Sequence, residues 1–287
     1  MHAATLRVFR RSITIAAALA GLVSLAIGAN AALNKRAPNQ AAMADAIAPD
    51  AAVFNKAARI ALVIGNGHYP DASTPLIQPV NDARALTAVL RRDGFEVDLI
   101  EDAGKDDMSR AIGRLQARIR PDSVVMLFFG GYGVQVGRES YMIPVDAAIW
   151  SETDVRRDGV SVESVLDAMS QQGACAKLVV LDASRRNPYE RRFRAFSHGL
   201  APINAPDNAL ILTSAAPDQV VEDSPGDTSA LVSELLNHIN AEGSGAEDVF
   251  NNTAVAVARS SDGKQVPAVS SRLLEQVLLG GAGNAGG

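Results

Sequence analysis

The chain has 287 residues, of which 47% are hydrophobic and 21% are charged, which is enough for one sizeable globular domain with additional terminal segments. Its net charge of −5 argues against a nucleic-acid partner, because binding to phosphates requires a basic surface. The single cysteine, Cys175, excludes an internal disulfide and a zinc site built from several cysteines.

The N-terminal 31 residues have the order of charged and apolar residues that is typical of a secretory signal peptide. Arginines occur within residues 1–11, the following segment 12–27 is uncharged and largely apolar, and residues 29–31 read Ala-Asn-Ala, an A-x-A cleavage site. An uncleaved inner-membrane anchor over residues 12–33 is the alternative. We therefore expect a periplasmic or secreted protein, in contact with a membrane only if this segment is retained.

Residues 32–58 are rich in Ala, Pro, Asn and Asp and are expected to form a linker. From residue 59 onward, short apolar runs alternate with amphipathic segments. Strands are predicted at 60–65, 96–101, 123–129, 177–182 and 209–214, and helices at 81–92, 107–119, 161–171, 228–239 and 247–259. This alternation predicts an α/β fold with a mainly parallel sheet and helices on both faces.

Three further local features are predicted. Asn81-Asp82 is interpreted as the N-terminal cap of the helix that follows. Residues 134–143 form a predicted hairpin around Gly137-Arg138. Residues 280–287 contain mostly Gly and Ala and are expected to be a flexible tail.

Two of the predicted strands end abruptly in small or polar residues. The apolar run 124–129 is followed by Gly131-Tyr132-Gly133, and the run 178–181 is followed by Asp182-Ala183-Ser184-Arg185. In open α/β sheets, ligands bind at the carboxyl ends of the strands. Tyr132 and Ser184 are therefore expected at a functional site.

Around these residues the sequence resembles the caspase-like peptidases, and more closely the bacterial metacaspases (orthocaspases). The resemblance covers residues 59–279 and rests also on ALVIGNGHY (61–69), PVNDARAL (79–86), YMIPVDA (141–147) and GLAPINAP (199–206). It implies a caspase-like three-layer sandwich, with a mainly parallel sheet between helices and an antiparallel edge or hairpin. Family members carry a base, His, in Gly-His-Gly and a nucleophile, Cys, about 50 residues later in Asp-Ala-Cys-Arg. Here both are exchanged, for Tyr132 and Ser184.

The exchanged pair is poorly suited to catalysis. A serine attacks a peptide bond only when a nearby base removes its proton. An unperturbed tyrosine, with a pKa of about 10, is deprotonated in only about one molecule per thousand at pH 7. We therefore predict an inactive caspase or metacaspase homologue, a pseudopeptidase that acts as an exported binding, regulatory or self-assembling scaffold protein.

The alternative is an active endopeptidase specific for Arg or Lys. Ser184 would be its nucleophile, and Tyr132 or one of two substitute bases in loops, His68 and His198, would accept the proton. Cys175 precedes the strand that leads to Ser184 and is expected at the opposite edge of the sheet, as a structural thiol.

The family resemblance also implies binding functions. The backbone N–H groups of Gly133 and Ser184 would form the oxyanion hole, and Asp182 would bind an Arg or Lys side chain of the substrate. If these groups persist, the double variant Ser184→Cys, Tyr132→His should regain some cleavage. The expected partners are a peptide or protein with a basic residue, and a second copy of the chain that pairs through an open sheet edge.

No metal site and no cofactor are predicted. Many metacaspases are activated by calcium, and the sequence contains an acidic loop with Asp218, Glu222, Asp223 and Asp227. The spacing of these residues differs from that of an EF-hand, which favours an ordinary solvated loop, with calcium binding as the alternative.

Overall fold

The computed structural model describes residues 57–70, 75–186, 188–189, 199–222, 226–240 and 243–279. The predicted signal peptide, nearly all of the predicted linker, the Gly/Ala tail and His198 lie outside the described residues. Among the described helices, none combines the length and apolar composition that crossing a membrane requires.

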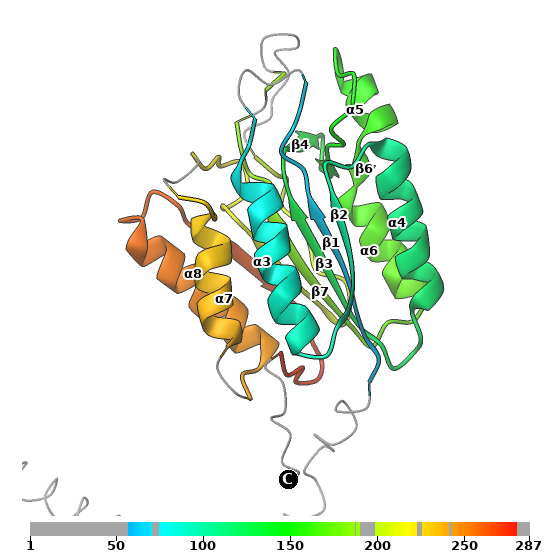
Figure 1. Cartoon of the computed structure of the whole chain (residues 1–287), viewed down its shortest axis with the longest axis vertical. Helices are drawn as coiled ribbons and strands as arrows, with labels where there is room; N and C mark the ends of the chain where they lie inside the picture. Colours follow the sequence, from blue (N-terminus) through cyan, green and yellow to red (C-terminus); the bar gives the residue numbers. More distant parts are fainter. Residues whose placement is uncertain are drawn as a thin grey trace, which may run out of the picture. The chain divides into compact units, whose positions relative to one another are not determined.

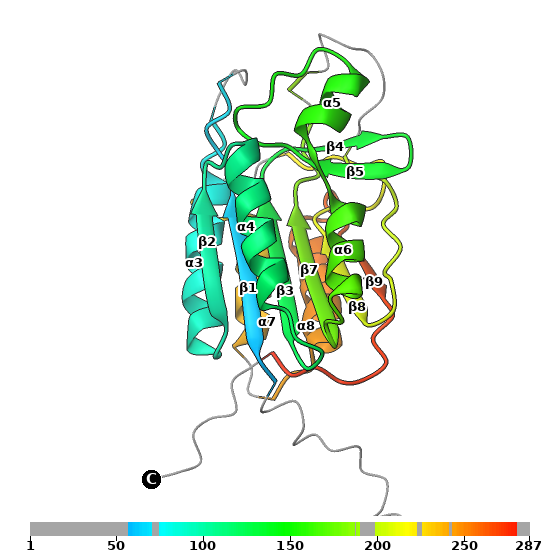
Figure 2. The same cartoon turned by 90° about the vertical axis from the view of Figure 1, so that its right-hand side faces the viewer.

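A six-stranded sheet forms the centre of the domain (Figures 1 and 2). Five strands are parallel and the sixth, at one edge, is antiparallel. In spatial order they are β2 (Glu96–Glu101), β1 (Arg59–Gly65), β3 (Val124–Gly130), β7 (Ala176–Asp182), β8 (Ala209–Thr213) and β9 (Ala268–Ser271). The α/β fold class with a mainly parallel sheet is therefore confirmed.

Helices cover both faces of this sheet (Figure 1). One face carries α3 (Gln78–Arg92), α7 (Ala230–Ile239) and α8 (Ala246–Ser260), and the other carries α4 (Lys105–Arg118) and α6 (Val162–Gln171). Alternate residues of the strands point to opposite faces. In β1, for example, Leu62 and Ile64 join the core under α4 and α6, whereas Ala61 and Val63 join the core under α3 and α7.

A small antiparallel sheet lies beside the carboxyl ends of the central strands (Figure 2). It consists of β4 (Gly133–Val136), β5 (Glu139–Met142) and β6 (Val160–Ser161), with the short helix α5 (Glu152–Asp158) nearby. The predicted hairpin is confirmed, and Gly137 at its turn has φ +66°, a conformation that glycine adopts without strain. The sequence analysis did not predict α5, β6 or β9, which are too short to show a clear hydrophobic period.

The predicted cap of the first helix is wrong. Helix α3 begins at Gln78, with Pro79 in its first turn, where a fixed φ and a missing N–H are tolerated. Asp82 consequently lies inside the helix and is fully buried. Its carboxylate accepts a hydrogen bond from the backbone N–H of Ser229, at the start of α7. The side chain that was interpreted as a local cap therefore links two helices.

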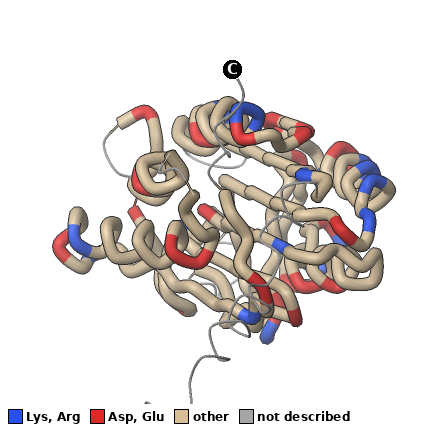
Figure 3. The backbone as a smooth tube through the Cα atoms, turned by 90° about the horizontal axis from the view of Figure 1, so that it is seen from below, with Lys and Arg blue, Asp and Glu red and all other residues tan. Residues whose placement is uncertain are grey.

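Acidic and basic residues are distributed over the helices and loops that surround the sheet (Figure 3). The edge strand β2 carries several of them, and helices α3 and α4 supply the opposite charges. The pairs are Arg84 with Glu101, Arg114 with Asp98, and Arg118 with Glu96. Charged side chains of this kind disfavour pairing of an edge strand with another chain.

Candidate functional site

The strand register places the ends of β1, β3 and β7 at one level. Gly65 lies beside Gly130, which lies beside Asp182. The loops that follow are also joined, because the N–H of Asn66 donates to the Gly130 carbonyl at 2.9 Å and that of Gly131 donates to the Asp182 carbonyl at 3.2 Å. Tyr132 and Ser184 therefore leave adjacent strands at the same edge of the sheet.

Ser184 is completely buried, with 0% of its surface exposed. Its hydroxyl oxygen has no hydrogen-bond partner. Its backbone is held on both sides, because its N–H donates to Ser214 Oγ at 3.3 Å and its carbonyl accepts from Val221 N at 2.7 Å. The predicted nucleophile is thus enclosed by protein, and no base is bonded to it.

Tyr132 is packed into an aromatic cluster and is 8% exposed. Its ring meets that of Tyr69 edge to face, with centroids 4.7 Å apart. The hydroxyl of Tyr69 accepts from Tyr132 N at 3.1 Å and donates to the Ile143 carbonyl at 2.9 Å. Burial raises the pKa of Tyr69, so this phenol stays neutral. The bond between Tyr132 and Ser184 that a dyad would need does not form, since the Ser184 hydroxyl has no partner.

The two backbone groups predicted to form the oxyanion hole are used inside the protein. The N–H of Gly133 donates to the Ala183 carbonyl at 2.9 Å. The N–H of Ser184 donates to Ser214, as described above. An oxyanion hole requires donors that point at the position of the developing charge. In this structure neither group is available to do so.

His68 lies on the rim but faces the other way. Its side chain is 69% exposed, and its Nδ1 is 2.6 Å from Asp102 Oδ2. Asp102 follows β2, which borders β1 on the side away from β3 and β7. The other oxygen of Asp102 accepts from the N–H groups of Gly67 and His68. Partial burial acts to raise the pKa of Asp102, but these hydrogen bonds lower it overall. The structure therefore pairs His68 with Asp102 and does not bring it to Ser184.

Three buried charged residues gather beside Ser184. Asp182 and Arg185 are paired, with Asp182 Oδ1 3.6 Å from the guanidinium of Arg185. That guanidinium also donates to the carbonyls of Gly131 and Asp182. Asp82 approaches from α3, and one carboxylate oxygen of Asp82 and one of Asp182 have no hydrogen-bond partner. Burial and the neighbouring Asp182 raise the pKa of Asp82 to about 7, although Ser229 and Arg185 act to lower it.

A small cavity opens beside Asp182 and Arg185. Its volume is about 10 Å³, which is close to the space that one water molecule needs. Val221 and Glu222 form one wall, and α3 and the start of α7 form others. The full lining is Gln78, Asp182, Arg185, Val221, Glu222, Ser229, Ala230 and Gln265. The cavity is strongly polar but, as it stands, too small for a side chain of a ligand.

The sequence analysis missed two residues of this site, Asp82 and Tyr69. Both lie in segments that carry the family resemblance, PVNDARAL and ALVIGNGHY. Neither showed its role, because each acts through a partner more than 60 positions away, Ser229 and Tyr132 respectively. Among the described residues, no group of three or more His, Cys, Asp or Glu side chains is arranged to hold a metal ion.

Comparison with known proteins agrees with this fold. The family model described as Caspase domain (Peptidase_C14) matches residues 58–278. The human mucosa-associated lymphoid tissue lymphoma translocation protein 1 and its mouse homologue are each 27% identical to this chain over 136 residues. The aligned part is 46% of this chain and 16% of either relative, so the chain matches only a small part of their length.

Proposed function

Because the chain belongs to the caspase domain family, we propose that it is a member without peptidase activity, whose site binds a basic side chain of a peptide or protein. We further propose that it descends from the metacaspase-like branch and acts outside the cytoplasm, since residues 1–31 have the order of a secretory signal.

The loss of activity is supported above all by the position of Ser184. Its hydroxyl is 0% exposed and unpartnered. A nucleophile must touch the substrate carbonyl and must lose its proton to a base within hydrogen-bond reach. A tyrosine packed against Tyr69 stands where the family has its histidine. The internal bonds of Gly133 and Ser184 also remove the donors that would stabilise the intermediate.

The proposed ligand class follows from the charges of the site. Asp82 and Asp182 bring two carboxylates, and Arg185 brings one positive charge. Because the pKa of Asp82 is raised to about 7, this carboxyl is only partly ionised at neutral pH, and an additional cation would favour its ionised form and complete the charge balance of the site. A guanidinium or ammonium group fits, since one oxygen of each carboxylate still lacks a donor. Its entry requires the wall formed by Val221 and Glu222 to move outward.

A fluorophosphonate reagent, which reacts with activated serines, tests the absence of catalysis. We expect no adduct in the intact mass of the full chain at neutral pH. We also expect that the chain does not cleave Arg- and Lys-containing peptides, with or without calcium. The double variant Ser184→Cys, Tyr132→His should not cleave them either, because the N–H groups of Gly133 and Ser184 remain bonded to Ala183 and Ser214. An adduct or turnover that disappears in Ser184→Ala would establish the serine peptidase instead.

Peptide binding is tested separately with matched peptides that contain either arginine or its neutral analogue citrulline. Calorimetry should show binding of the arginine peptides only. Asp182→Asn should weaken it at least tenfold, because a single charge-assisted hydrogen bond contributes about 1.5–3 kcal/mol. Asp207→Asn is the matched control, since Asp207 precedes β8 at the other end of the sheet. Equal binding of both peptides, or an equal effect of both substitutions, would reject the acidic site as the recognition element.

A further inference from the structure

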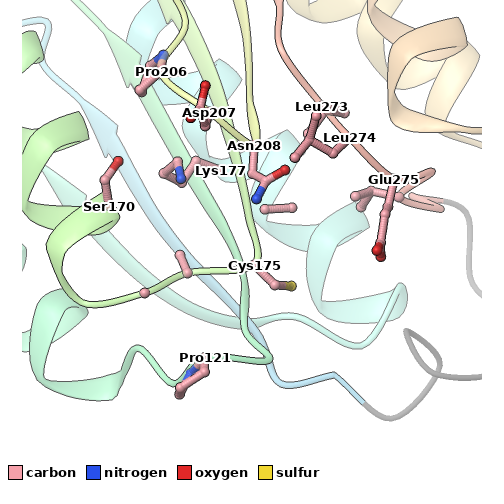
Figure 4. Close-up of a pocket in the computed structure, with 14 residues that line it drawn as sticks. Pro121, Ser170, Cys175, Lys177, Pro206, Asp207, Asn208, Leu273, Leu274 and Glu275 are labelled. Carbon is pink, nitrogen blue, oxygen red and sulfur yellow. The ribbon is translucent and has the colours of Figure 1, made fainter.

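A second cavity lies at the end of the sheet opposite Ser184, where β7 and β8 begin (Figure 4). Its volume is about 620 Å³, within the range of small-molecule sites. The end of α6, the segment before β8 and residues 273–277 surround it. Cys175, the single cysteine of the chain, lies on its wall.

Lys177 is the distinctive residue of this cavity. It is the second residue of β7 and is only 3% exposed. Its backbone N–H donates to the Asn208 carbonyl, but no described residue accepts a hydrogen bond from its amino group or lies within ion-pair distance of it. Figure 4 shows the amino nitrogen among the lining residues. Burial lowers the pKa of Lys177, although Asp207 opposes this. Although the residue as a whole is buried, its amino nitrogen is open to the cavity, where an acceptor of a ligand can reach it.

The other charges around the cavity narrow the class of ligand. Asp207 is engaged by Arg272 at 2.8 Å, and Glu275 adds a second carboxylate. With Asp207 offset by Arg272, Lys177 and Glu275 balance each other, so the cavity carries no excess positive charge for a polyphosphate, whereas Lys177 alone can pair with a single negative charge. The remaining wall is largely apolar, and it includes Leu274, a leucine that is 78% exposed. A ligand with an apolar body would cover this side chain.

We propose that this cavity binds a small monocarboxylate with an apolar body, whose carboxylate pairs with Lys177 while its apolar part contacts residues 273–277. The site is separate from the proposed peptide site. It lies at the opposite end of the strands, so either proposal can fail without the other.

Cys175 provides a reporter for occupancy, because it is the sole thiol. The full chain is treated with iodoacetamide in the presence of octanoate, with octanol and acetate as controls that lack the charge and the apolar body respectively. We expect octanoate to slow alkylation of Cys175 at least fivefold and to raise the melting temperature, whereas octanol and acetate at the same concentration do neither. Absence of protection by octanoate, or equal protection by octanol, would overturn the proposal.

Substitution of the lysine tests the ion pair. Lys177→Met should weaken octanoate binding at least tenfold in calorimetry, and Lys177→Arg should retain it, because arginine keeps the positive charge. Lys264→Met, at an exposed lysine outside the cavity, should leave it unchanged. Near-ultraviolet circular dichroism verifies folding of each variant. If folded Lys177→Met bound octanoate as tightly as the unsubstituted chain, the assigned role of Lys177 would be rejected. If this variant does not fold, the alkylation experiment on the unsubstituted chain decides the proposal.

Discussion

At Ser184 the decisive property is the surroundings of the side chain, rather than the weak acidity of its hydroxyl alone. A thiol tolerates an apolar, enclosed position, whereas a hydroxyl normally finds a hydrogen-bond partner when it is buried. Here the hydroxyl has none. The neighbouring Ser214 differs, because its hydroxyl accepts the backbone N–H of Ser184. The two serines therefore make opposite contributions to stability, although both are fully buried.

We expect Ser184→Ala to leave the free energy of unfolding unchanged or to raise it by about 1 kcal/mol, because it removes a buried polar atom without a partner. Ser214→Ala should lower it by about 1–3 kcal/mol, because it leaves the N–H of Ser184 without an acceptor. Urea denaturation followed by circular dichroism measures both values. A Ser184→Ala variant as unstable as Ser214→Ala would show that the Ser184 hydroxyl has a partner after all.

Among the elements, the hairpin formed by β4 and β5 closes the site. Its first residue, Gly133, lies directly against the loop that follows β7. A methyl group at this position would lie 2.5 Å from Leu200 Cδ2 and 2.8 Å from the Ala183 carbonyl oxygen. The same close approach allows the hydrogen bond between Gly133 and Ala183. The hairpin is thus held against the loop that carries Ser184.

Gly133→Ala should destabilise the domain by about 1–3 kcal/mol, because the added methyl group overpacks this contact. Gly113→Ala is the matched control. Gly113 lies on the exposed face of α4 with no atom near its added Cβ, so alanine should stabilise the protein by about 0.5–1 kcal/mol. Thermal and urea unfolding measure the stability of both variants. Equal effects of the two substitutions would mean that the hairpin is not packed tightly against the loop.

Considered as a whole, the domain keeps a well-packed sheet with charged groups buried near both ends. Asp82 and Asp182 lie where the parallel strands end, and Lys177 lies where β7 begins.

Self-association through a sheet edge stays a prediction. Of the two edges, β9 (Ala268–Ser271) contains no charged residue, whereas β2 contains three, so β9 is the edge that is better suited to pairing.

The buried carboxylate of Asp82 makes the stability of the domain depend on pH. Its pKa of about 7 in the folded protein is above the value of about 3.9 in an unfolded chain, so between these pH values the folded state binds more protons. The contribution of Asp82 to stability is therefore present at about pH 4 and is lost as the pH rises to about 7. Asn in its place stays neutral and can still accept from Ser229 N.

We expect Asp82→Asn to become progressively more stable than the unsubstituted chain between pH 4 and 7, with a difference of up to a few kcal/mol. Urea unfolding of both proteins at each pH measures this difference, in which the titration of groups that do not interact with Asp82 cancels. A difference that stays constant over this range would show that Asp82 is ionised throughout.

The sequence by itself determined the parallel sheet and its covering helices, because hydrophobic periodicity and the residues at strand ends are local properties of the chain. Strand β2, for instance, has the predicted bounds, 96–101. The small and polar residues at the ends of two predicted strands likewise placed Tyr132 and Ser184 at the carboxyl edge, where the register of β3 and β7 brings their loops together.

Only the tertiary structure decided what these residues can do. Three features of the site depend on contacts between segments that are far apart in the sequence: Ser184 is enclosed, the N–H of Gly133 donates to the Ala183 carbonyl, and Asp82 approaches Asp182. The hydrogen bond from Ser229 to Asp82, for example, joins residues about 150 positions apart. Burial and hydrogen-bond partners are set by packing among such distant segments, so no local pattern predicts them. The unpartnered Lys177 belongs to the same class, since in the sequence it is only one polar residue at the start of an apolar strand.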